Sequence, residues 1–210
     1  MGNTVGSLTQ FQQSVLKGSL LGDGYLRRIS GRKNAFLEIN HSFKQRAYVD
    51  WKYSILENIS GSRPKARKSN GKRVAYRFYT RQMPEMTELV HHWYGDRGKC
   101  VPKDLKLDPV TLAIWFMDDG SLCGNADVYL NTQQFDSMSQ EILLNSLLEL
   151  GLHARLNRDK QYHRIRFLKQ SLPRLAEMIG PYVIPSMKYK LGYDPVETTR
   201  RSPVFIQTAG

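Results

Sequence analysis

The pattern of apolar and polar residues is repeated once along the chain. Two apolar runs of helical length end in Asp-Gly, at residues 16–24 and 112–120. Each run is followed by two short stretches of alternating polarity, a longer helical stretch, a second alternating pair and a short helical stretch. The pattern therefore predicts two copies of the order helix-strand-strand-helix-strand-strand-helix. The predicted fold class is α/β in the broad α+β sense, with a curved antiparallel sheet in each repeat.

Turn residues and the spacing of apolar residues set the expected boundaries. In the first copy we expect strands at 25–29 and 36–41, a helix at 44–59, strands at 65–68 and 74–80, and a helix at 84–93. The helix at 44–59 is indicated by Ala47, Trp51, Ile55 and Ile59 at four-residue spacing. In the second copy we expect strands at 121–123 and 128–132, a helix at 139–150, strands at 153–158 and 162–168, and a helix at 172–179. The expected organisation is a first repeat at 8–93, a linker at 94–108, a second repeat at 109–192 and a C-terminal tail at 193–210.

Alternation within the strands predicts that each sheet has an apolar face and a basic face. In the stretch from Arg73 to Phe78, Val74, Tyr76 and Phe78 fall on one face, while Arg73 and Arg77 fall on the other. The matching strands of the second copy place Arg155, Asn157, Arg164 and Arg166 opposite apolar neighbours. A charged sheet face is usually only solvated, but here it occurs in both copies.

The charge of the whole chain favours a nucleic-acid partner. The chain of 210 residues has 31 Lys and Arg against 19 Asp and Glu, a formal net charge of +12, and residues 63–81 hold eight Lys or Arg and no acid. Twisted antiparallel ribbons are able to enter the DNA major groove, where Arg and Asn contact base edges. The candidate DNA-binding residues are Arg27, Arg32, Lys65, Arg67, Lys72, Arg73, Arg77, Arg155, Asn157, Arg164 and Arg166.

The two acids that end the apolar runs, Asp23 and Asp119, are the candidate catalytic groups. A single Asp-Gly is usually only a helix end followed by a turn. Two copies at matched places, 96 residues apart, instead suggest a pair brought together across a pseudo-two-fold axis. Carboxylates leaving water need a partner or a metal, and carboxylates with phosphate oxygens and water suit Mg²⁺. Two such ions would activate water and stabilise the leaving oxygen in phosphodiester hydrolysis. The five histidines show no spacing that predicts a metal or nucleophilic site.

From about residue 15 to residue 191 the chain resembles the LAGLIDADG homing endonucleases, especially the single-chain members with two motifs. The stretches that carry the resemblance are Trp115-Phe116-Met117-Asp118-Asp119-Gly120, Leu130-Asn131-Thr132-Gln133 and Ile184-Pro185-Ser186-Met187-Lys188-Tyr189-Lys190-Leu191. The resemblance implies a monomer in which the two motif helices pack together at the centre. It also implies a site-specific, intron-encoded enzyme that cuts both strands of a long DNA target and leaves short 3′ overhangs.

The resemblance also implies roles for residues around the acids. Asp23 and Asp119 would hold two or more Mg²⁺ ions, with Mn²⁺ as a substitute, helped by the backbone carbonyls of Gly22 and Asp118. The Asp118 side chain is either a ligand or a hydrogen-bonding group behind the ligands. Lys99 and Lys190 stand 76 residues after Asp23 and 71 after Asp119. We choose these two over Lys103, Lys106 or Lys188 as the basic residues that stabilise developing phosphate charge.

Two other functions remain open at this stage. The same resemblance covers intron RNA maturases, which assist splicing with weak or lost cleavage, so intron RNA is an alternative partner. A transcription regulator is disfavoured because no separate helix-turn-helix module is apparent. Only two cysteines and no membrane-length apolar run predict an intracellular protein that does not bind membranes, in an organelle or a bacterial cytoplasm.

Overall fold

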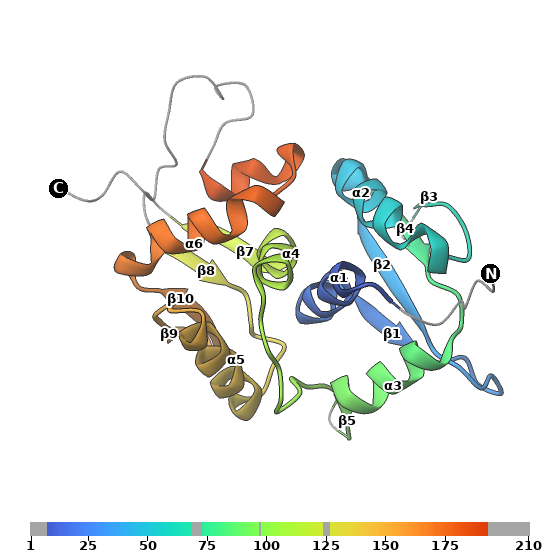
Figure 1. Ribbon diagram of the computed structural model, residues 1–210, viewed down its shortest axis with the longest axis horizontal. Coiled ribbons are helices and arrows are strands. Elements are labelled where there is room, and N and C mark those ends of the chain that lie inside the picture. The colour runs from blue at the N-terminus through green and yellow to red at the C-terminus, as the bar shows by residue number, and fades with distance from the viewer. Residues whose placement is uncertain (1–7, 69–72, 97, 124–126, 193–210) are drawn as a thin grey trace. The chain divides into compact units, whose positions relative to one another are not determined.

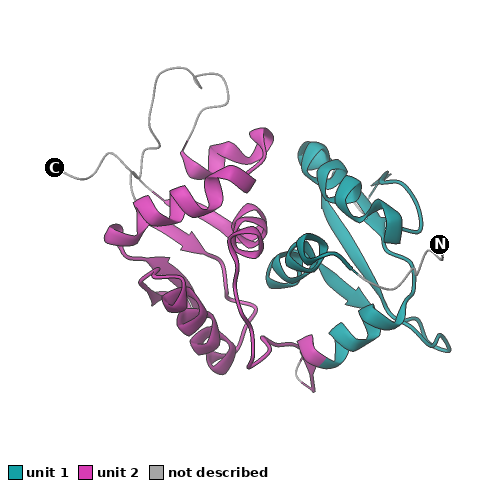
Figure 2. Cartoon of the chain, in the orientation of Figure 1, with its two compact units in different colours: residues 1–91 teal, residues 92–210 magenta. Residues whose placement is uncertain are grey.

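The computed structural model describes residues 8–68, 73–96, 98–123 and 127–192. The chain divides into two compact units, residues 1–91 and 92–210 (Figure 2), and each is described by itself. The expected tail at 193–210 and Lys72 lie outside the described residues. The expected boundaries of the linker stay a prediction.

The first unit has the predicted order of elements (Figure 1). Its helices and strands are α1 (Gln10–Leu21), β1 (Tyr25–Arg27), β2 (Phe36–Ser42), α2 (Arg46–Leu56), β3 (Lys65–Lys68), β4 (Val74–Tyr79) and α3 (Pro84–Trp93). Short 3-10 helices, η1 (Phe43–Gln45) and η2 (Glu57–Ile59), extend α2 at both ends. The strands form one antiparallel sheet in the order β1-β2-β4-β3. Helix α1 begins at a capping box, in which Thr9 and Gln12 bond reciprocally.

The second unit repeats this plan. It contains α4 (Pro109–Asp119), β7 (Gly120–Cys123), β8 (Asp127–Leu130), α5 (Ser137–Glu149), β9 (Ala154–Asp159), β10 (Tyr162–Phe167) and α6 (Leu172–Ile179). The sheet order, β7-β8-β10-β9, matches that of the first unit. Three further 3-10 segments are η3 (Lys169–Ser171), η4 (Gly180–Tyr182) and η5 (Pro185–Leu191). The α/β fold of two like repeats is thereby confirmed.

In each unit the helices pack on the apolar face of the sheet. In the first unit, α2 contacts β2 and β4 and α1 contacts β1, over the buried side chains of Leu37, Ile39 and Phe78. In the second unit, α5 contacts β9, and Ile165 and Phe167 are buried. The opposite face carries Arg27, Lys65 and Arg77 in the first sheet and Arg155, Arg164 and Arg166 in the second.

One element was not predicted, and one expectation is corrected by the structure. Residues 94–108, expected to link the repeats, contain a small ribbon, β5 (Tyr94–Gly95) and β6 (Gly98–Lys99). Strands of two residues are too short for alternation to reveal them. The buried stripe of α2 is Tyr48, Val49, Lys52 and Leu56, whereas Ala47 of the predicted repeat is exposed. Among the described residues, no helix has the length and apolar character needed to cross a membrane.

Candidate active site and nucleic-acid interface

The first motif acid follows directly on the end of α1. Gly22 is the C-cap of the helix, and its N–H donates to the Gly18 carbonyl. The Asp23 side chain is 50% exposed, so its carboxylate is open to solvent. Burial of Val15, Leu16, Leu20 and Leu21 fixes the helix that presents this acid.

The second motif acid, Asp119, is the last residue of α4. Its backbone carbonyl accepts hydrogen bonds from Asn131 N at 3.1 Å and Asn131 Nδ2 at 2.8 Å. The preceding residue, Asp118, is buried, and its carbonyl accepts a bond from Lys190 Nζ at 2.8 Å. The structure therefore brings one of the two predicted lysines to the end of the second motif helix. The ligand roles predicted for Gly22, Asp118 and Asp119 stay predictions.

Glycine is required at both motif positions, Gly24 and Gly120, because a Cβ atom would not fit there. A Cβ on Gly24 would lie 2.6 Å from the Ser19 carbonyl oxygen, and a Cβ on Gly120 would lie 2.6 Å from Cδ2 of Phe116. Gly120 has φ −67° and ψ 142°, values open to any residue, so the tight approach of the chain to α4 is the cause. Glycine at these places lets the chain turn back onto the helix immediately after the acid.

Replacing Gly120 by alanine is expected to destabilise the protein by about 1–3 kcal/mol, because the added methyl group overpacks a rigid core. Thermal or urea unfolding would measure the loss. Gly180→Ala is the matched control, since a Cβ there meets nothing within 4 Å. Equal stability of the two variants would contradict this explanation of the motif glycine.

The other predicted lysine, Lys99, lies in β6 of the second unit, paired with Tyr94. Its Nζ stands 6.0 Å from the centre of the Phe135 ring, a cation–π distance. Asp23 belongs to the first unit, so the pairing of Lys99 with that acid stays a prediction.

A histidine stands beside the first acid, contrary to the expectation that the histidines form no site. His41 Nδ1 lies 3.3 Å from Asp23 Oδ2, and the imidazole is only 2% exposed. His41 is in β2, two residues after Ile39 and four after Leu37, both buried. A polar residue in phase with buried apolar neighbours is the signal that could have revealed it.

The outer face of each sheet is the face opposite the packed helices. In the first sheet this face contains a pair of arginines held by one carboxylate. Cross-strand register places Tyr25, Glu38 and Tyr79 in one row. Glu38 is 6% exposed; its two oxygens lie 3.1 Å from Arg27 Nε and 3.3 Å from Arg77 Nη1. The Arg77 guanidinium also lies 5.3 Å from the centre of the Tyr79 ring. The two arginines predicted to bind DNA are therefore held in fixed positions.

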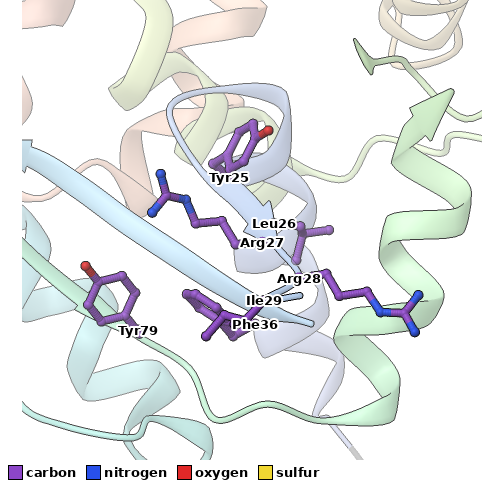
Figure 3. Close-up of a pocket in the computed structure, with 7 residues that line it drawn as sticks. All are labelled: Tyr25, Leu26, Arg27, Arg28, Ile29, Phe36 and Tyr79. Atoms are coloured by element: carbon purple, nitrogen blue, oxygen red, sulfur yellow. The ribbon is translucent and has the colours of Figure 1, made fainter. Parts of the chain in front are cut away.

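A hollow of about 540 Å³ lies next to this pair. Figure 3 shows aromatic and arginine side chains around it. Its lining residues are Tyr25, Leu26, Arg27, Arg28, Ile29, Phe36 and Tyr79. Of these, Tyr25 and Ile29 are about half exposed, at 51% and 49%, so apolar contact surface accompanies the positive charge.

The outer face of the second sheet follows the same principle with different residues. Arg166 is paired with Asp127 at 2.5 Å, and the Arg164 guanidinium lies 3.9 Å from the centre of the Tyr129 ring. Register places Arg155 opposite Arg166, and Asn157 opposite Arg164. The four predicted residues of this sheet therefore share one face.

The remaining predicted DNA-binding residues lie at the rim of the first sheet. Lys65 and Arg67 are exposed in β3, Arg73 is exposed just before β4, and Arg32 is exposed in the loop between β1 and β2. The opposite face of β4 points toward α2, where the Tyr76 hydroxyl donates to Asp50 Oδ1 at 2.9 Å. Desolvation, followed by the hydrogen bond to Asp50, raises the pKa of Tyr76.

Comparison with known proteins agrees with this arrangement. The model of the LAGLIDADG DNA endonuclease family matches residues 13–175. A solved structure of the homing endonuclease I-WcaI bound to its DNA recognition sequence is similar, with a TM-score of 0.81 and 27% identity. That similarity covers 90% of this chain and 88% of the other.

Two curated relatives differ in their described functions. A probable intron-encoded endonuclease of Wickerhamomyces canadensis is 28% identical over 88% of this chain and 85% of its own length. The cytochrome b mRNA maturase bI2 of Saccharomyces cerevisiae is 29% identical over 91% of this chain. The present chain spans only half the length of that maturase.

Proposed function

This chain belongs to the LAGLIDADG DNA endonuclease family, and we propose that it is an intron-encoded homing endonuclease acting as a monomer. Its substrate is a long double-stranded DNA target, both strands of which it hydrolyses to leave short 3′ overhangs. The observation that carries the proposal is the pairing, in each unit, of a motif acid with a sheet whose outer face is basic. A binding protein needs the basic face but has no physical need for the acids.

The acids suit a hard divalent cation. Asp23 presents a carboxylate that is half exposed, and carboxylate and carbonyl oxygens are the donors that Mg²⁺ and Mn²⁺ accept. Asp23 and Asp119, with the carbonyls of Gly22 and Asp118, would hold the ions. When bound, they supply an activated water and neutralise charge on the leaving oxygen.

The chain's own residues position the reacting strand. The arginine pairs of the two outer faces bind the duplex, with exposed residues such as Lys65 and Arg67 placed for phosphate contacts. Lys190, which donates to the Asp118 carbonyl, places an ammonium at the end of the second motif helix. There it stabilises negative charge that develops on the phosphate. Lys99 is proposed for the same role at the other strand.

The proposed activity is tested by capturing and sequencing the DNA ends that the protein produces. The purified protein would be incubated with a pool of random duplex DNA and Mg²⁺, and the ends produced would be captured and sequenced. We expect repeated double-strand cuts at one long sequence with 3′ overhangs. Folded protein that binds DNA and yields no enriched ends would contradict the proposal.

A second candidate function is assistance of intron RNA splicing. It is favoured by the similarity to the yeast maturase, which covers 91% of this chain. The same test separates the two functions, because a maturase without nuclease activity would yield no cut ends. Its intron RNA would then be retained in preference to duplex DNA of equal length.

Glu38 is expected to set the sequence discrimination of the first sheet. Glu38→Gln would release Arg27 and Arg77 from their fixed positions and remove a negative charge from the DNA-binding face. We expect tighter binding to unrelated DNA and a loss of discrimination of about 1–3 kcal/mol at the base pairs these arginines contact. Competition binding with target and unrelated duplexes would measure both effects.

The matched control is Glu57→Gln, which makes the same charge change at an exposed residue of η2. If both variants change discrimination equally, net charge is responsible and the orienting role of Glu38 is wrong.

A further inference from the structure

A row of buried side chains leads away from the first motif acid within the first unit. Asp23 contacts His41, whose ring centre lies 5.2 Å from that of Tyr48 in α2. One helical turn further on, Lys52 Nζ lies 4.5 Å from the centre of the Tyr48 ring. Tyr48 and Lys52 are both 0% exposed. Three side chains that nothing in the family resemblance assigned are thus connected to the acid.

The burial of Lys52 indicates that the side chains of this row do more than fill space in the core. Removing an ammonium group from water is costly unless partners compensate for the lost hydration. The face of Tyr48 supplies part of that compensation through a desolvated cation–π contact. A methionine would fill similar space at no such cost. The lysine, in turn, restricts the rotation of the tyrosine ring that lies against His41.

His41 is placed to fix one of the two oxygens of Asp23. A carboxylate that is 50% exposed has free rotation about its side-chain bonds unless a neighbour holds it. An Nδ1–H directed at Oδ2, 3.3 Å away, holds the group in one orientation. Because the imidazole is 2% exposed and packed against Tyr48, its own rotation is restricted.

We propose that His41 is a positioning residue for the Asp23 carboxylate and that Tyr48 and Lys52 form its rigid support. The proposal rests on the proposed function, in which Asp23 holds the metal ion. It adds to that function a role for His41, Tyr48 and Lys52, which together orient the Asp23 carboxylate before any ion binds. None of the three residues needs to contact DNA for this role.

The second unit has different residues at the corresponding place. Tyr25 and Ser121 each follow a motif glycine and pair with Glu38 and Tyr129. His41, three residues after Glu38, therefore corresponds to Thr132, three residues after Tyr129. Thr132 is fully buried, and its carbonyl accepts a bond from Gln140 Nε2 at 2.9 Å. The support of the two acids is thus asymmetric, and the row is a property of the first unit.

The first test observes the contact in the metal-free protein and needs no enzymatic activity. Nuclear magnetic resonance of imidazole-labelled protein is expected to show a protected His41 Nδ1–H signal. That signal should disappear in Asp23→Ala, broaden in Lys52→Met, and remain in the control Thr132→Ala. Its absence from the wild-type protein, or its persistence in Asp23→Ala, would overturn the proposal.

The second test measures Mn²⁺ binding by electron paramagnetic resonance. We expect His41→Ala to bind Mn²⁺ about 10- to 100-fold more weakly, as when an outer partner of a metal ligand is removed. His41→Asn should restore affinity, since its amide places a donor near the former Nδ1. Wild-type affinity in His41→Ala would refute the role of His41. Failure of the wild-type protein to bind Mn²⁺ would instead contradict the proposed function.

Discussion

Asp23→Asn and Asp119→Asn are each expected to slow DNA cleavage by at least about 10³-fold, equivalent to roughly 4 kcal/mol of transition-state stabilisation. The amide is nearly isosteric with the carboxylate but lacks the charge that holds a divalent cation. Binding of the target should persist, because the basic outer faces of both sheets are untouched. Single-turnover cleavage and equilibrium binding on the same duplex would measure the two effects.

Two controls make this result specific. Unfolding curves should show that both variants remain folded, and Asp50→Asn, a surface carboxylate of α2 in the first unit, should cleave at the normal rate. Normal cleavage by either motif variant would show that the assignment of the acids is wrong.

Affinity for DNA is expected to fall by about 10³- to 10⁵-fold between 50 and 200 mM salt, the loss for six to ten phosphate contacts. The cause is release of condensed counterions by the Lys and Arg side chains of a chain with net charge +12. Fluorescence anisotropy over a salt series would give the slope. A weak dependence on salt would contradict binding through the basic faces.

A double variant tests how much strand β3 contributes to this salt dependence. Lys65→Gln combined with Arg67→Gln removes two exposed charges from β3. The logarithmic salt slope should decrease by about two units if both side chains contact phosphates. The same pair of substitutions should leave the discrimination between target and unrelated DNA almost unchanged.

The order of elements was predictable because the sequence repeats strong local signals. Helices α3 and α6 begin and end where the apolar spacing and Pro84 or Leu172 predicted. Strand β1 ends at Arg27, two residues earlier than predicted, because its pairing with β2 stops at Arg27, opposite Phe36. The residue at which a strand ends depends on hydrogen bonds to its partner strand. The sequence of one segment alone does not show where those bonds stop.

The acids were predictable and their neighbours were not. Asp23 and Asp119 are marked by the motif, whereas His41 reaches Asp23 only through the fold, 18 residues later. The burial of Lys52 was missed because sequence patterns assign lysine to solvent, which shifted the predicted stripe of α2 by one residue. Long-range contacts of polar residues therefore required the structure.

Each outer sheet face has a carboxylate that contacts arginine, Glu38 beside Arg27 and Arg77 in the first unit and Asp127 beside Arg166 in the second. These acids sit on strands that are hydrogen-bonded to the strands bearing their partner arginines. The orientation of the arginines that we propose to contact DNA is consequently set within each unit. A hybrid gene that contains one complete unit of this protein is therefore expected to keep that unit's arginine–carboxylate contacts without redesign of individual side chains.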